Sequence, residues 1–207
     1  MPDEDFLKDA YRDRSDDETR AYYQEWARTY DQEVGGNDYA QPVRCAEALL
    51  SLLTPENTEV LDVGCGTGLS GLALRRAGYP VLDGCDYSSE MLQRAGKTGA
   101  YRRLFETNLN APPIDAGDGA YDAATCVGVF SFGHVSPDAL REILRVVKPG
   151  GPVIIGLNEM FYEKGDLTRK MAELQDAGRL EILSQEKGDH LPGEDMAGWV
   201  IRLRKSG

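Results

Sequence analysis

The sequence predicts an α/β protein with a mostly parallel sheet that helices cover on both faces. From Glu59 onward, short apolar runs of strand length alternate with segments of helical periodicity, a pattern typical of doubly wound sheets. A glycine-rich turn at 64–68 follows the first run, where open sheets of this class bind ligands. After residue 158 the rhythm changes to one helical segment and two candidate strands, which predicts an antiparallel pair that finishes the sheet.

The elements follow in order. A helix from Pro42 to Leu53 has proline near its start and apolar residues on one face. The next helices carry Leu69–Arg76, Met91–Ala95 and Leu140–Val147, and the last spans Asp166–Ala177. The predicted strands are Val60–Val63, Val81–Cys85, Tyr101–Phe105, Asp122–Val129, Val153–Leu157, Leu180–Ser184 and Met196–Leu203. The charged group Arg202–Lys205 is interpreted as a tail.

The N-terminal part divides into two predicted segments. Residues 1–20 are rich in charge and predict a mobile acidic extension, whereas residues 21–207 are expected to form one domain. Within that domain, 21–55 predicts a helical lid, since aromatic residues recur at helical spacing as far as Val34, before Gly35–Asn37. The aromatic stripe either closes over a ligand or packs the helix onto the sheet. Tyr30 is the residue that we expect on the ligand side.

Composition limits the partners. The 207 residues fit one domain, and 41% hydrophobic with 28% charged residues is ordinary for a globular chain. A net charge of −12 repels phosphate backbones and anionic lipid. We therefore expect neither nucleic acid nor membrane as a partner, although an acidic surface also serves solubility. The oligomeric state is left open.

Location and metal content are also constrained. No apolar run approaches the roughly 20 residues that span a bilayer, and the acidic N-terminus lacks the features of a signal peptide. We therefore expect a cytoplasmic protein. The aspartates at 115, 118 and 122 have no histidine partner, so no metal site is predicted. The four cysteines form no CxxC pair and are expected to be reduced: Cys45, Cys65, Cys85 and Cys126.

The glycine turn has the spacing GxGxG at Gly64, Gly66 and Gly68. Glycines let the backbone turn tightly and let a ligand approach where a Cβ would block it. A dinucleotide site has GxGxxG, but Leu69 stands at the third glycine position. The phosphate loop GxxxxGK[ST] is also absent. The turn therefore indicates a nucleoside without phosphates.

Asp86 closes the second predicted strand. A carboxylate there accepts hydrogen bonds from both hydroxyls of a ribose, and the alternative is a solvated aspartate that caps a helix. Tyr87 can cover one face of an adenine. Met91 lies one helical turn further on, where it either touches the same ring or belongs to the core.

Four motifs in this order resemble the class I S-adenosylmethionine-dependent methyltransferases: Asp62–Gly68, Asp86–Leu92, Tyr121–Asp122 and Leu144–Gly151. The resemblance spans roughly residues 20–160. It implies S-adenosylmethionine as the cofactor and a Rossmann-like, seven-stranded sheet in the order 3-2-1-4-5-7-6 with the last strand antiparallel. More narrowly, Cys126–Val135 resembles bacterial relatives of the methyltransferase-like protein of the Williams–Beuren region.

The resemblance also implies the cofactor contacts. It places the backbone of the glycine turn at the methionine part, Asp86 at the ribose, and Tyr87 with Met91 at the adenine. Asn108 stands where the family usually has aspartate, and its carbonyl oxygen can still meet the adenine amino group. The cofactor residues expected are Tyr30, Asp62, Gly64, Cys65, Gly66, Asp86, Tyr87, Met91, Asn108, Leu109, Val127 and Gly128.

The predicted function is in-line methyl transfer to a small-molecule acceptor. His134 follows the fourth strand and has a suitable pKa for a general base, or it is a packing residue, whereas His190 is expected at the surface. The acceptor side is expected around Phe132, His134 and the segment 158–162. Two alternatives stay open: a protein or RNA methyltransferase, and a protein that binds the cofactor without catalysis.

Overall fold

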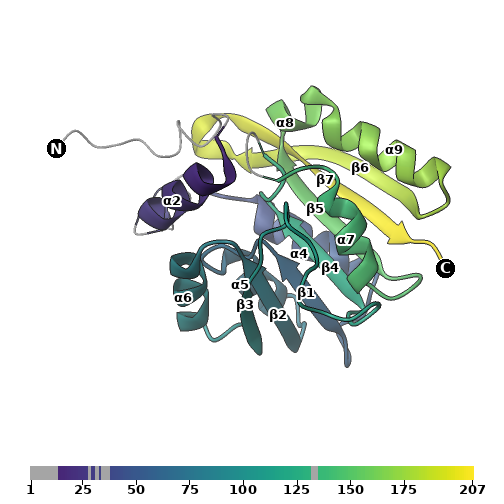
Figure 1. The fold of residues 1–207 in the computed structure, drawn as a ribbon, viewed down its shortest axis with the longest axis horizontal. Coiled ribbons are helices and arrows are strands. Elements are labelled where there is room, and N and C mark those ends of the chain that lie inside the picture. Colours follow the sequence, from purple (N-terminus) through teal and green to yellow (C-terminus); the bar gives the residue numbers. More distant parts are fainter. Residues whose placement is uncertain (1–13, 28, 31–32, 34–37, 132–134) are drawn as a thin grey trace.

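A seven-stranded sheet in the order β3-β2-β1-β4-β5-β7-β6 forms the centre of the protein (Figure 1). The computed structural model describes residues 14–27, 29–30, 33, 38–131 and 135–207. Neighbouring strands are parallel except that β7 runs antiparallel to β5 and β6. This confirms the predicted topology. The strands are β1 Glu59–Val63, β2 Val81–Asp86, β3 Arg103–Glu106, β4 Ala123–Val127, β5 Pro152–Asn158, β6 Leu180–Leu191 and β7 Met196–Lys205.

Helices cover both faces of the sheet because neighbouring residues of each buried strand point to opposite layers. Leu61 and Ile155 belong to the apolar cluster with α7 and α9, whereas Val60 and Ile154 belong to the cluster with α4 and α5. In Figure 1 the first layer lies in front of the sheet and α4 behind it. The helices are α2 Asp16–Trp26, α4 Gln41–Leu50, α5 Leu69–Arg76, α6 Ser89–Lys97, α7 Ala139–Val146, α8 Glu159–Lys164 and α9 Asp166–Asp176.

The N-terminal helix begins earlier than the predicted boundary at residue 20. Ser15 caps α2 by accepting from the Glu18 N–H, and the Glu18 carboxylate accepts from the Ser15 N–H in return, a capping box that starts a helix. The helix therefore lies partly inside the segment that we expected to be a mobile extension. It ends at Trp26, whereas the aromatic spacing predicted helix as far as Val34, which lies outside the described residues.

The two helices that the structure describes with bounds in the predicted lid segment, α2 and α4, have different positions. In α4, Cys45 and Leu49 are buried in the cluster that lies on the sheet with α5. Only α2 lies beside the carboxyl ends of the first strands (Figure 1). The lid interpretation therefore concerns α2, and α4 is a core helix. Among the described residues, no helix is both long and apolar enough to cross a membrane.

His190 is buried, which corrects its expected surface position. Strand β6 continues to Leu191, well beyond the predicted end at Ser184, so His190 lies in the strand and is 5% exposed. Its ring meets Tyr39 edge-on, with centroids 5.2 Å apart, and its backbone carbonyl accepts from the Ala40 N–H. The polar sequence of the segment hid this strand, because one face of an edge strand is solvated.

His190 is expected to make the folded protein less stable as the pH falls from about 6.5 to about 4. Burial, with a smaller contribution from Arg44, lowers the pKa of His190 from 6.5 to about 4. Between these values the unfolded chain binds a proton that the folded chain does not, which costs up to about 3 kcal/mol. Urea unfolding at about pH 7.5 and about pH 4.5 measures this loss, which should be smaller in His190→Phe. Equal losses in both proteins would contradict the prediction.

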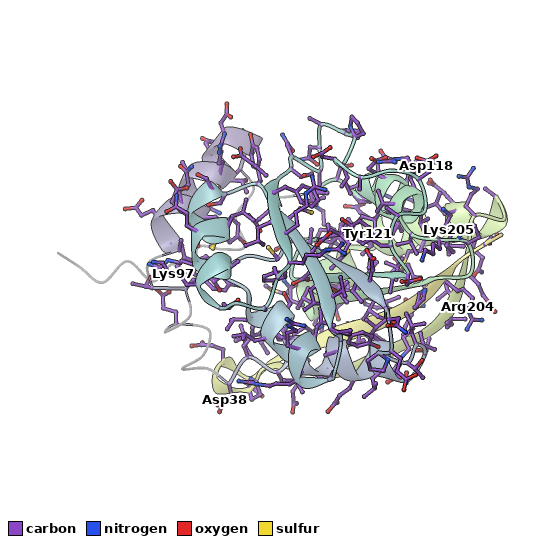
Figure 2. The ribbon with its side chains drawn as sticks, turned by 90° about the horizontal axis from the view of Figure 1, so that it is seen from below. Asp38, Lys97, Asp118, Tyr121, Arg204 and Lys205 are labelled. Atoms are coloured by element: carbon purple, nitrogen blue, oxygen red, sulfur yellow. The ribbon has the colours of Figure 1, made fainter. Side chains whose placement is uncertain are left out.

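The C-terminal charged group belongs to the sheet, which corrects its interpretation as a tail. Lys205 ends β7, and its Nζ donates to the Val147 carbonyl at 2.7 Å. Figure 2 shows Lys205 near Asp118 and Tyr121, at the end of the sheet remote from Asp38. Asp118 pairs there with Arg145 at 2.6 Å. These contacts close the end of the sheet opposite to the glycine turn.

Candidate functional site

A cleft opens at the carboxyl ends of β1, β2, β3 and β4, beneath α2. It encloses about 790 Å³ including its open mouth, within the range of small-molecule sites. Its position matches the general rule that open α/β sheets bind ligands outside the carboxyl ends of their strands. The cleft is lined by Thr19, Tyr23, Tyr30, Gly64, Gly66, Cys85, Asp86, Tyr87, Met91, Thr107, Asn108, Leu109, Asn110, Val127, Gly128, Val129 and Val135.

The glycine turn forms one wall of this cleft. Gly64 has φ of 64°, and a Cβ there would lie 2.5 Å from Cγ2 of Val129, so a side chain at this position is excluded. Gly66 has φ of 53°, and a Cβ there would meet no atom within 4 Å. Because Gly66 has no side chain, the wall of the cleft stays open at this position, and ligand atoms can approach the protein backbone closely.

Asp86 joins the end of β2 to the glycine turn. The Gly66 N–H donates to Oδ2 and the Ser88 N–H donates to Oδ1, both at 2.9 Å. Burial raises the pKa of Asp86, while the hydrogen bonds from Ser88 and Gly66 lower it. A carboxylate offers about four acceptor positions, so Asp86 can still accept hydrogen bonds from a ligand. Ser88, in turn, caps α6 by accepting from the Met91 N–H.

Asp62 does not line the cleft. It is completely buried, and it accepts hydrogen bonds from the hydroxyls of Ser70 at 2.5 Å, Tyr101 at 2.7 Å and Thr125 at 3.0 Å. It therefore ties α5 and β4 together behind the glycine turn. In a strand, alternate side chains face opposite sides of the sheet, and that places Asp62 toward α5 and α4.

Cys65 also lies behind the wall. Its side chain is 4% exposed, and its N–H donates to the Cys85 carbonyl at 2.9 Å. The other predicted cofactor residues are brought together: each of them lines the cleft. For these residues the cofactor contact stays a prediction. His134 and Phe132 lie outside the described residues.

Several lining residues were missed by the sequence analysis. Thr19 and Tyr23 face the cleft from α2, and their spacing of four residues is the helical signal that could have found them. Thr107 and Asn110 follow β3 and flank Asn108 and Leu109, the two residues of this loop that the resemblance named. Asn108 Oδ1 accepts from the Asn110 N–H at 2.9 Å, and this bond orders the loop.

The charge of the cleft suits a nucleoside that carries no phosphate. Among the described residues that line it, Asp86 is charged and none is Lys, Arg or His. A pyrophosphate or phosphate site normally offers basic side chains or a helix N-terminus to the anion. A ribose with two free hydroxyls and a cationic group fits this wall better. The residues present therefore fit S-adenosylmethionine, whose sulfonium is positive.

A second hollow adjoins the cleft. It encloses about 1450 Å³, open to solvent, between the loop at Pro112, the start of α7 and the helix α8. Leu109, Asn110 and Val135 line both cavities, so these three residues form a shared wall. The remaining lining residues are Pro112, Ser131, Ser136, Pro137, Asp138, Ala139, Arg141, Glu142, Phe161, Lys164 and Asp166.

Comparison with known proteins identifies the family. A model described as a methyltransferase domain matches residues 60–151. Methyltransferase-like protein 27 from Homo sapiens is 39% identical over 168 residues, which cover 78% of this chain and 68% of that protein. The malonyl-[acyl-carrier protein] O-methyltransferase of Erwinia pyrifoliae is 34% identical over 173 residues, covering 83% of this chain and 63% of that protein. The chain thus spans about two thirds of the length of these relatives.

Solved structures agree on the fold. A SAM-dependent methyltransferase from Thermotoga maritima, described as a possible histamine N-methyltransferase, superposes with a TM-score of 0.65 at 18% identity. The match covers 89% of this chain and 98% of that one, and at such identity it concerns the fold alone. With the sequence relatives, the sheet order and the glycine cleft in agreement, the chain belongs to the class I S-adenosylmethionine-dependent methyltransferases, and S-adenosylmethionine is its cofactor.

Proposed function

We propose that this enzyme transfers the methyl group to a small-molecule acceptor bound in the second hollow, which we therefore call the acceptor hollow. The observation that carries the proposal is the shared wall of Leu109, Asn110 and Val135 between that hollow and the cofactor cleft. Two ligands that occupy adjoining cavities can bring their reacting atoms together without a further domain.

The lining of the acceptor hollow supports an acceptor with both apolar and polar parts. Phe161 and Pro112 offer apolar surface, while Arg141 and Lys164 place positive charge opposite the carboxylates of Asp138 and Asp166. The segment 158–162, expected to line this side, contributes Phe161. Its other aromatic residue does not take part, because the ring of Tyr162 stacks on Trp199 with centroids 3.9 Å apart.

Charge argues against nucleic acid as the acceptor. The chain carries a net charge of −12, and such a surface repels phosphate backbones. A carrier-bound acceptor is a specific alternative, since one relative is named for a malonyl group on an acyl-carrier protein. Both alternatives are outcomes of the experiment described below.

Residues of this chain would bind and orient the reactants. S-adenosylmethionine, when bound, supplies a methyl group attached to a positively charged sulfur. The methyl carbon is therefore already activated for displacement. Asp86 would accept from the ribose hydroxyls, and Tyr87 with Met91 would border the adenine. Val129 and Val135 would exclude water from the shared side of the cleft. Orientation of this kind contributes on the order of 7–11 kcal/mol to lowering a barrier.

A general base is needed if the acceptor must lose a proton before attack. His134 remains our candidate for that role, from its place in the sequence after β4. A His134→Gln variant is expected to keep cofactor affinity and to lose turnover with an oxygen or carbon acceptor.

The test combines cofactor titration with an acceptor screen. Calorimetry should show binding of S-adenosylmethionine and of its demethylated product with Kd in the micromolar range or tighter, roughly −8 kcal/mol. Labelled S-adenosylmethionine is then incubated with small-molecule pools, and methylated products are identified by mass spectrometry. With the acceptor known, Arg141→Gln should raise its KM several-fold. The matched control Arg204→Gln lies at the far end of β7 (Figure 2) and should change nothing.

Three results would overturn the proposal. Transfer of label to RNA or to a protein, with no small molecule methylated, would assign the macromolecular acceptor instead. Label on an acyl group carried by a carrier protein would assign the tethered acceptor. Cofactor binding without transfer to any class of acceptor would assign a protein that binds the cofactor without catalysis.

A further inference from the structure

Helix α2 covers the cofactor cleft and has two lining side chains, Thr19 and Tyr23. Of its described side chains, Thr19 and Trp26 are the buried ones. Trp26 packs with Tyr30, ring centroids 4.6 Å apart, and with Leu191 at the tip of the β6–β7 hairpin. The C-terminal end of the helix is therefore held by an apolar cluster on one side of the cleft.

On the other side of the cleft, α2 is held by polar contacts. Its side facing α6 borders a third cavity, lined by the polar residues Gln24, Glu25, Glu90 and Gln93 among others. An open polar cavity between two helices contributes little apolar burial, so it holds them together weakly. Specific contacts must supply the attachment on this side.

Arg20 supplies such contacts. Its Nη2 donates to Oε1 of Glu106 at 2.6 Å, and its guanidinium carbon lies 5.0 Å from the ring centroid of Tyr87. Glu106 is the last residue of β3, and Tyr87 lines the cleft directly after Asp86. One side chain thus joins the covering helix to the ends of two strands that form the opposite wall.

We propose that Arg20 is a positioning residue that latches α2 over the cofactor cleft and orders the Tyr87 ring as its wall. Opening of α2 must break the Arg20–Glu106 pair and uncover Tyr87. Arg20 therefore slows the departure of the cofactor and of its demethylated product without touching either reacting group. This inference rests on the cofactor occupying the cleft, as in the proposed function.

The first test needs no ligand. Hydrogen exchange of the α2 amides is compared between wild type and Arg20→Gln in the ligand-free protein. Exchange in α2 should become about three- to tenfold faster in the variant, the effect of losing a half-exposed ion pair and a cation–π contact. Arg20→Lys keeps the charge but not the flat guanidinium, so its exchange should be intermediate.

The second test uses the demethylated product, S-adenosylhomocysteine, as the probe. Stopped-flow fluorescence should show dissociation about three- to tenfold faster from Arg20→Gln. Salt should accelerate dissociation from wild type but not from the variant, because the ion pair is screened only where it exists. Glu106→Gln removes the ion pair but keeps the contact of Arg20 with Tyr87, so it should give a smaller acceleration, and the double variant should dissociate like Arg20→Gln.

The matched control is Arg103→Gln. Arg103 also pairs with a carboxylate, that of Asp115 at 2.5 Å, and stacks over Phe105 at 4.4 Å, but it does not touch α2 in the described contacts. Equal effects of Arg103→Gln and Arg20→Gln, or no effect of Arg20→Gln on α2 exchange, would overturn the latch. If wild type binds no S-adenosylhomocysteine, the proposed function fails while the exchange test still decides the latch.

Discussion

Replacing Asp86 with alanine is expected to weaken the binding of S-adenosylmethionine by at least about 100-fold. Hydrogen bonds to a charged group contribute roughly 1.5–3 kcal/mol each, and Asp86 is the proposed acceptor for both ribose hydroxyls. The change also frees the Gly66 and Ser88 N–H groups, which donate to this carboxylate, so the glycine turn loses an anchor. Calorimetric titration of cofactor and demethylated product into both proteins measures the effect.

Two controls separate binding from folding. Asp86→Asn keeps one acceptor oxygen and should lose less affinity than alanine. Asp118→Asn changes an aspartate at the opposite end of the sheet (Figure 2) and should bind like wild type. Thermal unfolding shows whether each variant is folded. A folded Asp86→Ala protein with wild-type affinity would exclude Asp86 from the cofactor site.

Replacing Asp62 with alanine is expected to cost about 3–5 kcal/mol of stability, the scale of breaking a buried charged network. Burial raises the pKa of Asp62 to about 6, against hydrogen bonds from Ser70, Tyr101 and Thr125 that lower it. Above that pH the carboxylate is ionised and accepts from all three hydroxyls. Each hydroxyl left buried without a partner costs about 1–3 kcal/mol. Urea unfolding at about pH 7.5 measures the loss.

Asp62→Asn should lose less stability than Asp62→Ala, because the amide oxygen still accepts from one or two of the hydroxyls. Under conditions where both variants are folded, their affinity for the cofactor should remain within a few-fold of wild type. Unchanged stability together with a large loss of affinity would instead return Asp62 to the list of residues that contact the cofactor. Substitutions of Asp86 should therefore act mainly on cofactor affinity, whereas substitutions of Asp62 should act mainly on the stability of the fold.

The strands were predictable because buried parallel strands are apolar runs bounded by turn residues, whereas their order in the sheet was implied by the family resemblance and not by these runs. The predicted strand boundaries were wrong where one face of the strand is exposed to solvent. The polar second half of β6, from Gln185 to Asp189, is exposed at every position except Gly188, and the strand lies at the edge of the sheet. Such a strand is defined by its pairing with β7, which periodicity in a single segment does not reveal.

The cofactor residues divide in the same way. Gly66, Asp86 and Tyr87 were predicted from motifs and lie together in one cleft. Asp62 belongs to the same motif but faces α5, because it occupies the opposite side of β1 from Leu61. A sequence motif indicates which segment of the chain lies near a ligand. The pleat of the strand then decides which side chains of that segment face the ligand.

The sequence by itself determined the α/β class, the glycine turn and the acidic residue that ends β2, because these depend on local periodicity and spacing. Only the tertiary structure decided that His190 is buried against Tyr39 and that Arg20 reaches Glu106, 86 residues away. It alone also brought Leu109 and Val135 into a wall between two cavities. The physical reason is that these contacts join segments far apart in the chain, and their geometry depends on how whole elements pack rather than on any local pattern.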